Sequence, residues 1–172
     1  IERDKAIPFG DAPSFIVNWW QGWSPDSRYF LYRENNVLMR YDVRDDSQDV
    51  LFDTLDASSR AWWSPDGAWI IVVTAQALFL MSIDGNISYT EATNGVIEVF
   101  WSPDSTQLAY TLENGMVRVY DVSGDSSREV VRFNDPVQLR AWSPDGRWLT
   151  VVTDPEYEQE VVFNVDVALN EV

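Results

Sequence analysis

Apolar residues in this chain fall into short runs that are separated by polar, turn-forming residues. The runs are rich in β-branched and aromatic side chains, and no apolar period of 3.6 residues is sustained. The pattern therefore predicts strands and no long helix. The clearest runs are Tyr29–Tyr32, Trp69–Val73, Leu108–Tyr110 and Trp148–Val152.

The same short stretch, Trp-Ser-Pro-Asp followed by Gly or Ser, precedes each of these runs. Successive copies are spaced by 40, 38 and 41 residues, and a fixed period near 40 residues is typical of a repeat architecture. Pro presets φ for a type I turn, Gly accepts positive φ, and Asp can bond the backbone ahead of it, so each copy predicts a tight turn. The repeat motif comprises Trp23, Pro25, Asp26, Trp63, Pro65, Asp66, Trp101, Pro103, Asp104, Trp142, Pro144 and Asp145.

Each repeat is expected to hold four antiparallel strands, and the repeats are placed at residues 18–57, 58–95, 96–136 and 137–172. Residues 1–17 are expected to supply an outer strand, Ala6–Phe9, to a neighbouring or closing unit. Asn114-Gly115 between two apolar runs is a strong hairpin signal. The predicted strands are Asn18–Trp23, Tyr29–Arg33, Val37–Asp42, Val50–Asp53, Arg60–Trp63, Trp69–Thr74, Leu78–Ile83, Ile87–Thr90, Ile97–Trp101, Gln107–Leu112, Met116–Val122, Glu129–Phe133, Gln138–Trp142, Trp148–Thr153 and Val161–Val165.

Four antiparallel strands in about 40 residues are the signature of a β-propeller blade. The four Trp-Ser-Pro-Asp motifs, and strands that end in Tyr41-Asp42-Val43, Tyr120-Asp121-Val122 and Val165-Asp166-Val167, resemble the WD-repeat-like propeller units of TolB-type proteins. The resemblance covers nearly the whole chain and implies an all-β propeller of four four-stranded blades. The second unit departs from the pattern, with Ser82 where the others carry Asp. Such blades occur in many unrelated proteins, so the resemblance leaves function open.

The sequence is compatible with two numbers of blades in the functional ring. The fourth unit lacks a clear fourth strand, for which Ala168–Val172 is the candidate within the unit itself. Ala6–Phe9 could complete that unit in the same chain, which gives a four-bladed ring. It could instead complete the unit of a second copy, which gives a ring of about eight blades and removes an open sheet edge. Bulky Trp-rich blades favour the larger ring.

Composition excludes several kinds of chemistry. The chain has no His and no Cys, which removes histidine-activated nucleophiles, thiol catalysis and His or Cys metal sites. A pair of carboxylates could still cleave glycosidic bonds, but none of the 28 acidic residues is singled out. We therefore expect no enzyme, no catalytic residue and no cofactor. Calcium is the one metal considered, at the acidic stretch Asp42–Asp49, which lacks the spacing of an EF-hand loop.

With a formal net charge of −16, the chain is expected to repel nucleic acid and anionic lipid, so neither is a predicted partner. No apolar run is long enough to span a membrane. The first residue is Ile1 and no signal peptide is present, so we expect a mature form or a fragment. The compartment stays unknown, although an acidic surface of this kind suits an extracytoplasmic protein.

The leading hypothesis is a non-enzymatic propeller scaffold that binds a protein partner or itself, with a homodimer completing a larger ring. One alternative is a carbohydrate-binding or carbohydrate-cleaving propeller, and another is a structural segment of a larger protein. The candidate partner contacts are aromatic residues beyond the repeat pattern and residues of a long acidic loop: Trp19, Trp20, Trp62, Tyr157 and Glu158.

Overall fold

A computed structural model describes residues 22–92, 95–153 and 161–168. All of its regular structure is β. Fourteen strands form four antiparallel sheets, each built mainly from strands that follow one another in the chain. Within the described ranges, no helix is long and apolar enough to cross a membrane.

The sheets follow the predicted repeats and are called blades 1 to 4. Blade 1 holds β1 (Tyr29–Glu34), β2 (Val37–Asp42) and β3 (Ser47–Phe52). Blade 2 holds β4 (Arg60–Trp63), β5 (Trp69–Val73), β6 (Ala77–Ser82) and β7 (Ile87–Ala92). Blade 3 holds β8 (Val96–Trp101), β9 (Gln107–Leu112), β10 (Met116–Asp121) and β11 (Ser126–Arg132). Blade 4 holds β12 (Val137–Trp142), β13 (Trp148–Thr153) and β14 (Val162–Asp166).

Among the described residues, the two middle blades have the four strands that were predicted. In the described residues, blade 1 has three strands plus one isolated bridge between Trp23 and Phe30, at the end of the predicted strand Asn18–Trp23. The described part of blade 4 has three strands, of which β14 is the last. The predicted strands Ala6–Phe9 and Ala168–Val172 lie outside the described residues, except for Ala168, which belongs to no strand.

Strand positions are close to those predicted, and the largest shifts are in the outer strands. β3 begins at Ser47, where Val50 was predicted, because Tyr41 and Asp42 of β2 pair with Gln48 and Ser47. β11 likewise begins at Ser126, where Glu129 was predicted. Cross-strand hydrogen bonds therefore continue through polar residues that carry no apolar strand signal.

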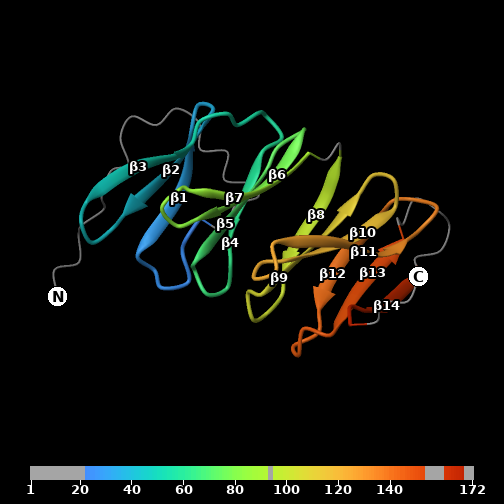
Figure 1. Cartoon of the computed structure of the whole chain (residues 1–172). Helices are drawn as coiled ribbons and strands as arrows, with labels where there is room; N and C mark the ends of the chain where they lie inside the picture. The colour runs from blue at the N-terminus through green and yellow to red at the C-terminus, as the bar shows by residue number, and fades with distance from the viewer. Residues whose placement is uncertain (1–21, 93–94, 154–160, 169–172) are drawn as a thin grey trace.

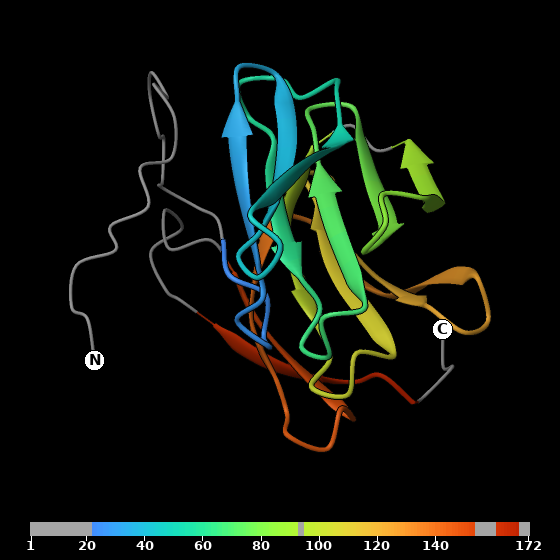
Figure 2. The same cartoon turned by 90° about the vertical axis from the view of Figure 1, so that its left-hand side faces the viewer.

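The blades lie face to face in a row, with blade 1 and blade 4 at opposite ends (Figure 1). Viewed along the row, the sheets lie one behind another (Figure 2). Alternate residues of a strand face opposite neighbours. In β5, Ile70 and Val72 pack toward blade 1, and Ile71 and Val73 pack toward blade 3.

Three apolar clusters fill the three junctions between blades, and each joins two consecutive blades. At the first junction, Phe52 and Phe79 lie 4.8 Å apart between ring centroids, and at the third, Phe133 and Phe163 lie 5.0 Å apart. None of these clusters joins blade 1 to blade 4 among the described residues. The described blades therefore form an open stack with two end sheets (Figure 1).

Candidate functional site

The four motif turns share one hydrogen-bonded geometry. In each turn the Ser hydroxyl donates to the carboxylate of the Asp two residues later and accepts the backbone N–H five residues later, at the start of the next strand. In the second copy, Ser64 Oγ donates to Asp66 and accepts from Trp69 N at 3.0 Å. The Asp side chain in turn accepts the N–H of Ala68 at 3.0 Å. Equivalent bonds join Ser24, Asp26 and Tyr29, then Ser102, Asp104 and Gln107, and finally Ser143, Asp145 and Trp148.

The backbone conformation of these turns explains the type of residue that follows each motif Asp. Ser27, Gly67, Ser105 and Gly146 all have positive φ, between 59° and 74°, a region that favours Gly and costs other residues energy. The hydrogen bond from the neighbouring Ser, followed by backbone amides, lowers the pKa of Asp26, Asp104 and Asp145. Carboxylates held ionised in this way close the turn and are poorly suited to act as general acids.

The four motif Trp residues occupy unequal environments. Trp63 and Trp142 are buried, and each indole Nε1–H donates across a junction to the residue before the preceding motif Trp: Trp63 to Gly22 O at 3.2 Å, and Trp142 to Phe100 O at 3.1 Å. The indole nitrogen of Trp101, Nε1, is buried but has no hydrogen-bond partner among the described residues. Trp23 is 52% exposed, because no described sheet precedes blade 1.

The first and fourth repeats each hold an Arg–Asp pair. In blade 1, Arg28 Nη2 lies 2.7 Å from Asp42 Oδ2, and in blade 4, Arg147 Nη2 lies 2.7 Å from Asp166 Oδ2. The Arg28 guanidinium, helped by backbone amides, holds the pKa of Asp42 at about 2. The second repeat has Ala68 and Ser82 at these two positions, whereas the third has Thr106 and keeps Asp121. The missing Arg therefore does not account for Ser82.

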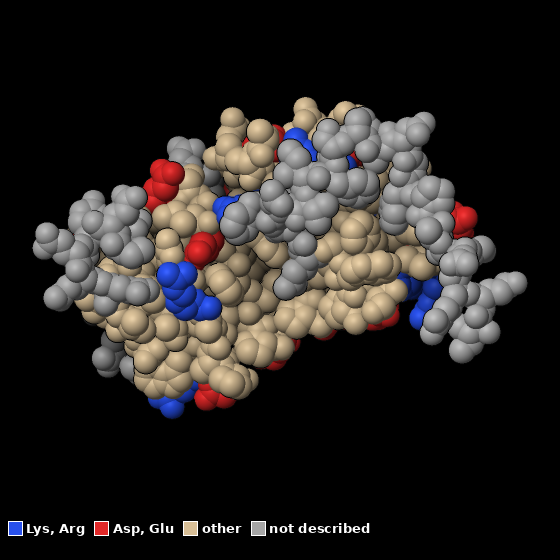
Figure 3. All heavy atoms as spheres, turned by 180° about the vertical axis from the view of Figure 1, so that it is seen from behind, with Lys and Arg blue, Asp and Glu red and all other residues tan. Residues whose placement is uncertain are grey.

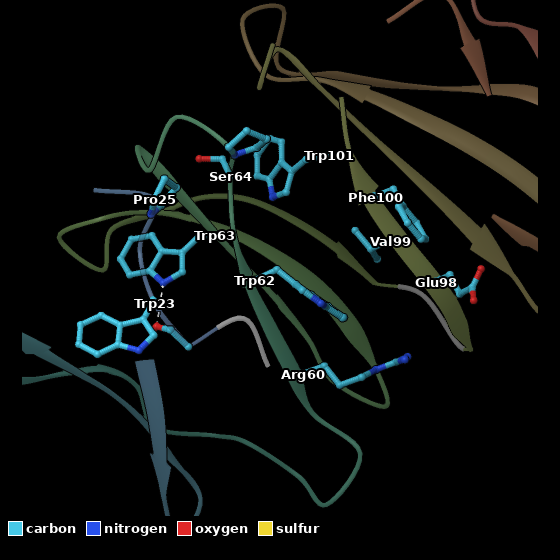
Figure 4. Close-up of a pocket in the computed structure, with 12 residues that line it drawn as sticks. Trp23, Pro25, Arg60, Trp62, Trp63, Ser64, Glu98, Val99, Phe100 and Trp101 are labelled. Atoms are coloured by element: carbon cyan, nitrogen blue, oxygen red, sulfur yellow. Dashed lines mark hydrogen bonds between the residues drawn. The ribbon is translucent and has the colours of Figure 1, made fainter. Parts of the chain in front are cut away.

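A groove of about 860 Å³ lies where blades 1, 2 and 3 meet (Figure 4). Trp62 of β4 lies between the Trp23–Trp63 side and the side chains of β8 (Figure 4). Most of the lining is apolar and aromatic, as in ligand pockets generally. This groove, called the Trp62 groove, is lined by Gly22, Trp23, Pro25, Arg60, Trp62, Trp63, Ser64, Pro65, Glu98, Val99, Phe100 and Trp101.

Three polar side chains that line the Trp62 groove differ in whether their hydrogen-bonding atoms have partners. The Arg60 guanidinium lies 5.6 Å from the centre of the Trp62 ring and donates to Ile97 O at 3.0 Å. Glu98 accepts the backbone N–H of Leu139, but its Oε2 atom is buried with no partner among the described residues. Burial raises the pKa of Glu98, against the opposing effect of that amide and of Arg140 and Arg60. Glu98 Oε2 and Trp101 Nε1 are thus both buried without a hydrogen-bond partner among the described residues.

Comparisons with known proteins find two curated relatives by sequence. One is the Tol-Pal system protein TolB of Chromobacterium violaceum, 36% identical over 67 residues, which are 37% of this chain and 15% of TolB. The other is the human U3 small nucleolar RNA-associated protein 4 homolog, 29% identical over 101 residues, or 50% of this chain and 15% of that protein. No protein-family model matches the chain.

Solved structures agree on the fold. A chain of the Kuenenia stuttgartiensis hydrazine synthase structure superposes with a TM-score of 0.64 at 17% identity, covering 85% of this chain. A chain in a mitotic checkpoint complex structure gives a TM-score of 0.63 at 19% identity, covering 86%. The chain is a TolB-like, WD-repeat-like β-propeller. It spans 45% of each of those two structures and a smaller share of the curated relatives.

The predicted contact residues of the propeller fall into two groups. Trp62 lies in the Trp62 groove, together with the motif residues Trp23, Pro25, Trp63, Pro65 and Trp101. Trp19, Trp20, Tyr157 and Glu158 lie outside the described residues. Sequence reasoning missed Arg60 and Glu98. Glu98 is a charged residue within an otherwise apolar predicted strand. This break in the apolar pattern could have identified it from the sequence.

The acidic stretch of the propeller considered for calcium is not one loop. It turns at Asp46, where φ is 49°, and its last residues belong to β3. Arg28 binds Asp42 and Asp45, Arg40 binds Asp49, and the Tyr41 hydroxyl donates to Asp46. These carboxylates are each directed at a side chain of the protein, and the described part of the chain holds no group of three potential metal ligands.

No strand of the described residues pairs with the outer edge of β14, in the last blade of the propeller. In the middle blades, a fourth strand (β7 or β11) covers the third, whereas β14 is the outermost strand of blade 4 in the described structure. Val161, Val162 and Phe163 are exposed at its start. Residues other than Lys, Arg, Asp and Glu form most of the described surface seen from behind, with charged residues scattered among them (Figure 3).

Proposed function

We propose that this chain is a non-enzymatic propeller module that associates with protein by completing its open blade. The observation that carries the proposal is the exposed edge of β14, where the middle blades have a further strand. An unpaired strand edge is a ready template for another strand, and strand addition is a common mode of protein recognition. The apolar side chains at the start of β14 would be covered by such a strand.

The partner that we propose is a second copy of the chain, which donates the strand predicted at Ala6–Phe9. Reciprocal exchange between two copies would place eight blades in one ring, within the usual range for propellers. The placement of blades 1 and 4 at opposite ends of the row supports this arrangement over a four-bladed ring closed within one chain (Figure 1). The same position could be filled by a further segment in a longer protein.

The proposal of a non-enzymatic role is based on the residue types that the chain contains. The chain has no His or Cys, and the motif carboxylates are used to close turns. The net charge of −16 argues against nucleic acid as the partner.

A charge placed on the β14 edge tests the proposal. Val162→Lys should lower the mass in solution, measured by light scattering across a concentration series, because an edge Lys blocks strand pairing. Val50→Lys is the matched control, since Val50 is 60% exposed on β3 and Val162 is 59% exposed on β14. Equal masses for all three proteins at every concentration would contradict the role of this edge.

A further inference from the structure

At the first junction, blade 1 holds the motif Trp of blade 2 with an aromatic ring and a backbone carbonyl. Arg28 binds Asp42, and its guanidinium lies 4.8 Å from the centre of the Tyr29 ring. Tyr29 stacks on Trp63, with 6.2 Å between ring centroids. Trp63 Nε1–H also donates to Gly22 O, the carbonyl of the residue before the motif Trp of blade 1.

Blade 4 has the same groups at the other end of the row. Arg147 binds Asp166 and lies 5.1 Å from the centre of the Trp148 ring. Trp148 holds the repeat position of Tyr29 but is 37% exposed, since no described sheet follows blade 4. The carbonyl before the motif Trp of blade 4 belongs to Ala141, an exposed residue.

A pocket of about 390 Å³, called the blade 4 pocket, lies beside these groups. Leu149 and Val151 of β13 pack against blade 3. Trp148 and Thr150, which alternate with them, therefore face away from blade 3. The pocket thus lies where a following blade would place its motif Trp. Its described lining consists of Trp142, Ser143, Trp148, Thr150 and Asn164.

Trp23 is the motif Trp of blade 1, and no described sheet precedes that blade. Trp63 and Trp142 are buried at their junctions, whereas half of Trp23 is exposed. Trp23 lies at the margin of the Trp62 groove, on the side away from β8 (Figure 4). Blades 1 and 4 lie at opposite ends of the row (Figure 1), so Trp23 and the blade 4 pocket of one chain do not meet.

We propose that the blade 4 pocket binds Trp23 of a second copy. The indole ring stacks on Trp148 and its Nε1–H donates to Ala141 O, as motif indoles donate at the first and third junctions. Two copies that exchange this contact reciprocally close a ring. This inference rests on the self-association proposed above and adds a second surface to the β14 edge. Thr150 is polar where blade 1 has Leu31, so the contact buries less apolar surface and should be reversible.

Light scattering across a concentration series tests the contact, in salt that screens the repulsion between two copies of net charge −16. Trp23→Ala removes the indole, and Thr150→Arg fills the pocket. Each should raise the dimer dissociation constant at least about thirtyfold, as for truncation of an interface Trp hot spot. Ile87→Ala and Gln76→Arg, at exposed positions of blade 2, are the matched controls and should change nothing. Equal constants for wild type, Trp23→Ala and Thr150→Arg would overturn the proposal.

A mixture of the two variants separates loss of the contact from loss of the fold. Trp23→Ala keeps the pocket and Thr150→Arg keeps the indole, so the mixture should associate more tightly than either variant alone. If both variants are folded by circular dichroism and the mixture gains nothing, the proposal is wrong.

The indole N–H resonance of Trp23, assigned by NMR with Trp23→Phe, follows the contact without a pocket variant. It should shift as the concentration of wild type rises, while the Trp63 resonance, whose proton is already bonded, stays in place. An unmoved Trp23 resonance while the mass doubles would refute this contact and leave the β14 edge as the interface. Dimerisation of Val162→Lys with the Trp23 shift retained would refute the edge and support the contact. A protein that stays monomeric throughout contradicts both.

Discussion

Replacing Trp63 and Trp23 by Ala tests the packing of the blades, because the two residues hold the same place in the repeat but differ in burial. Trp63 is 2% exposed and Trp23 is 52% exposed. Trp63 lies in the cluster between blades 1 and 2, stacks on Tyr29 with 6.2 Å between ring centroids, and donates to Gly22 O. The ring of Trp23 is tilted against that of Phe30, with 5.1 Å between ring centroids.

A buried Trp changed to Ala typically costs about 3–5 kcal/mol, including the cavity left behind. Loss of the bond to Gly22 O places Trp63→Ala toward the upper end. Trp23→Ala should cost only about 1 kcal/mol, since half of its surface is already in water. With a urea m-value of about 2 kcal/mol/M, the midpoint should fall by about 2 M for Trp63→Ala and by about 0.5 M for Trp23→Ala.

The assay is urea unfolding followed by both circular dichroism and Trp fluorescence, because repeat proteins can unfold in more than one step. Trp63→Phe is a useful third variant, since it keeps an aromatic ring and removes the indole donor. It should fall between the other two. If Trp23→Ala destabilises the protein as much as Trp63→Ala, the face-to-face packing described for blades 1 and 2 is wrong.

Three further predictions concern the turns and the Arg–Asp pair. Gly115→Ala should destabilise the protein much more than Gly146→Ala in urea unfolding. Both have positive φ, worth about 1–2 kcal/mol for Ala, but only at Gly115 would the new Cβ meet backbone, 2.3 Å from Phe133 O. Ser64→Ala should cost about 1–2 kcal/mol and more than Ser143→Ala, because Ser64 is buried; equal costs would contradict this. Asp42→Asn should lower the melting temperature at pH 7. Because folding lowers the pKa of Asp42 from 3.8 to about 2, its stabilising effect is present above pH 4 and is lost as the pH falls toward 2. The difference in melting temperature between wild type and Asp42→Asn should therefore shrink across that range, and a constant difference would refute the role of the ion pair.

The sequence was sufficient to predict the strands and turns because both are determined by nearby residues. Pro144, Asp145 and Gly146 specify a turn by themselves, and the apolar runs specify the strands that follow. The outer strands β3 and β11 were placed less well, because polar residues such as Gln48 join them through pairing with the preceding strand. Position 82 was noticed as a departure, and nothing in the structure explains it, since the third repeat keeps Asp121 although Thr106 stands in the Arg position.

The Trp62 groove could not be predicted as a site, since it depends on how three blades meet. Trp62 was singled out as a surplus aromatic, and the structure places it in the groove. Glu98 and Arg60 belong to different blades, and nothing in their local sequence indicates that they line one cavity. The unpaired Trp101 donor is visible only when its environment is compared with those of Trp63 and Trp142.

The central claim, that the open blade is completed by a second copy, is tested most directly by the mass of the protein in solution with and without residues 1–12. We expect the whole chain to reach twice its 19.8 kDa mass as concentration rises, and deletion of residues 1–12 to leave a monomer. A stable monomer at all concentrations, with mass and unfolding midpoint unchanged by the deletion, would contradict it.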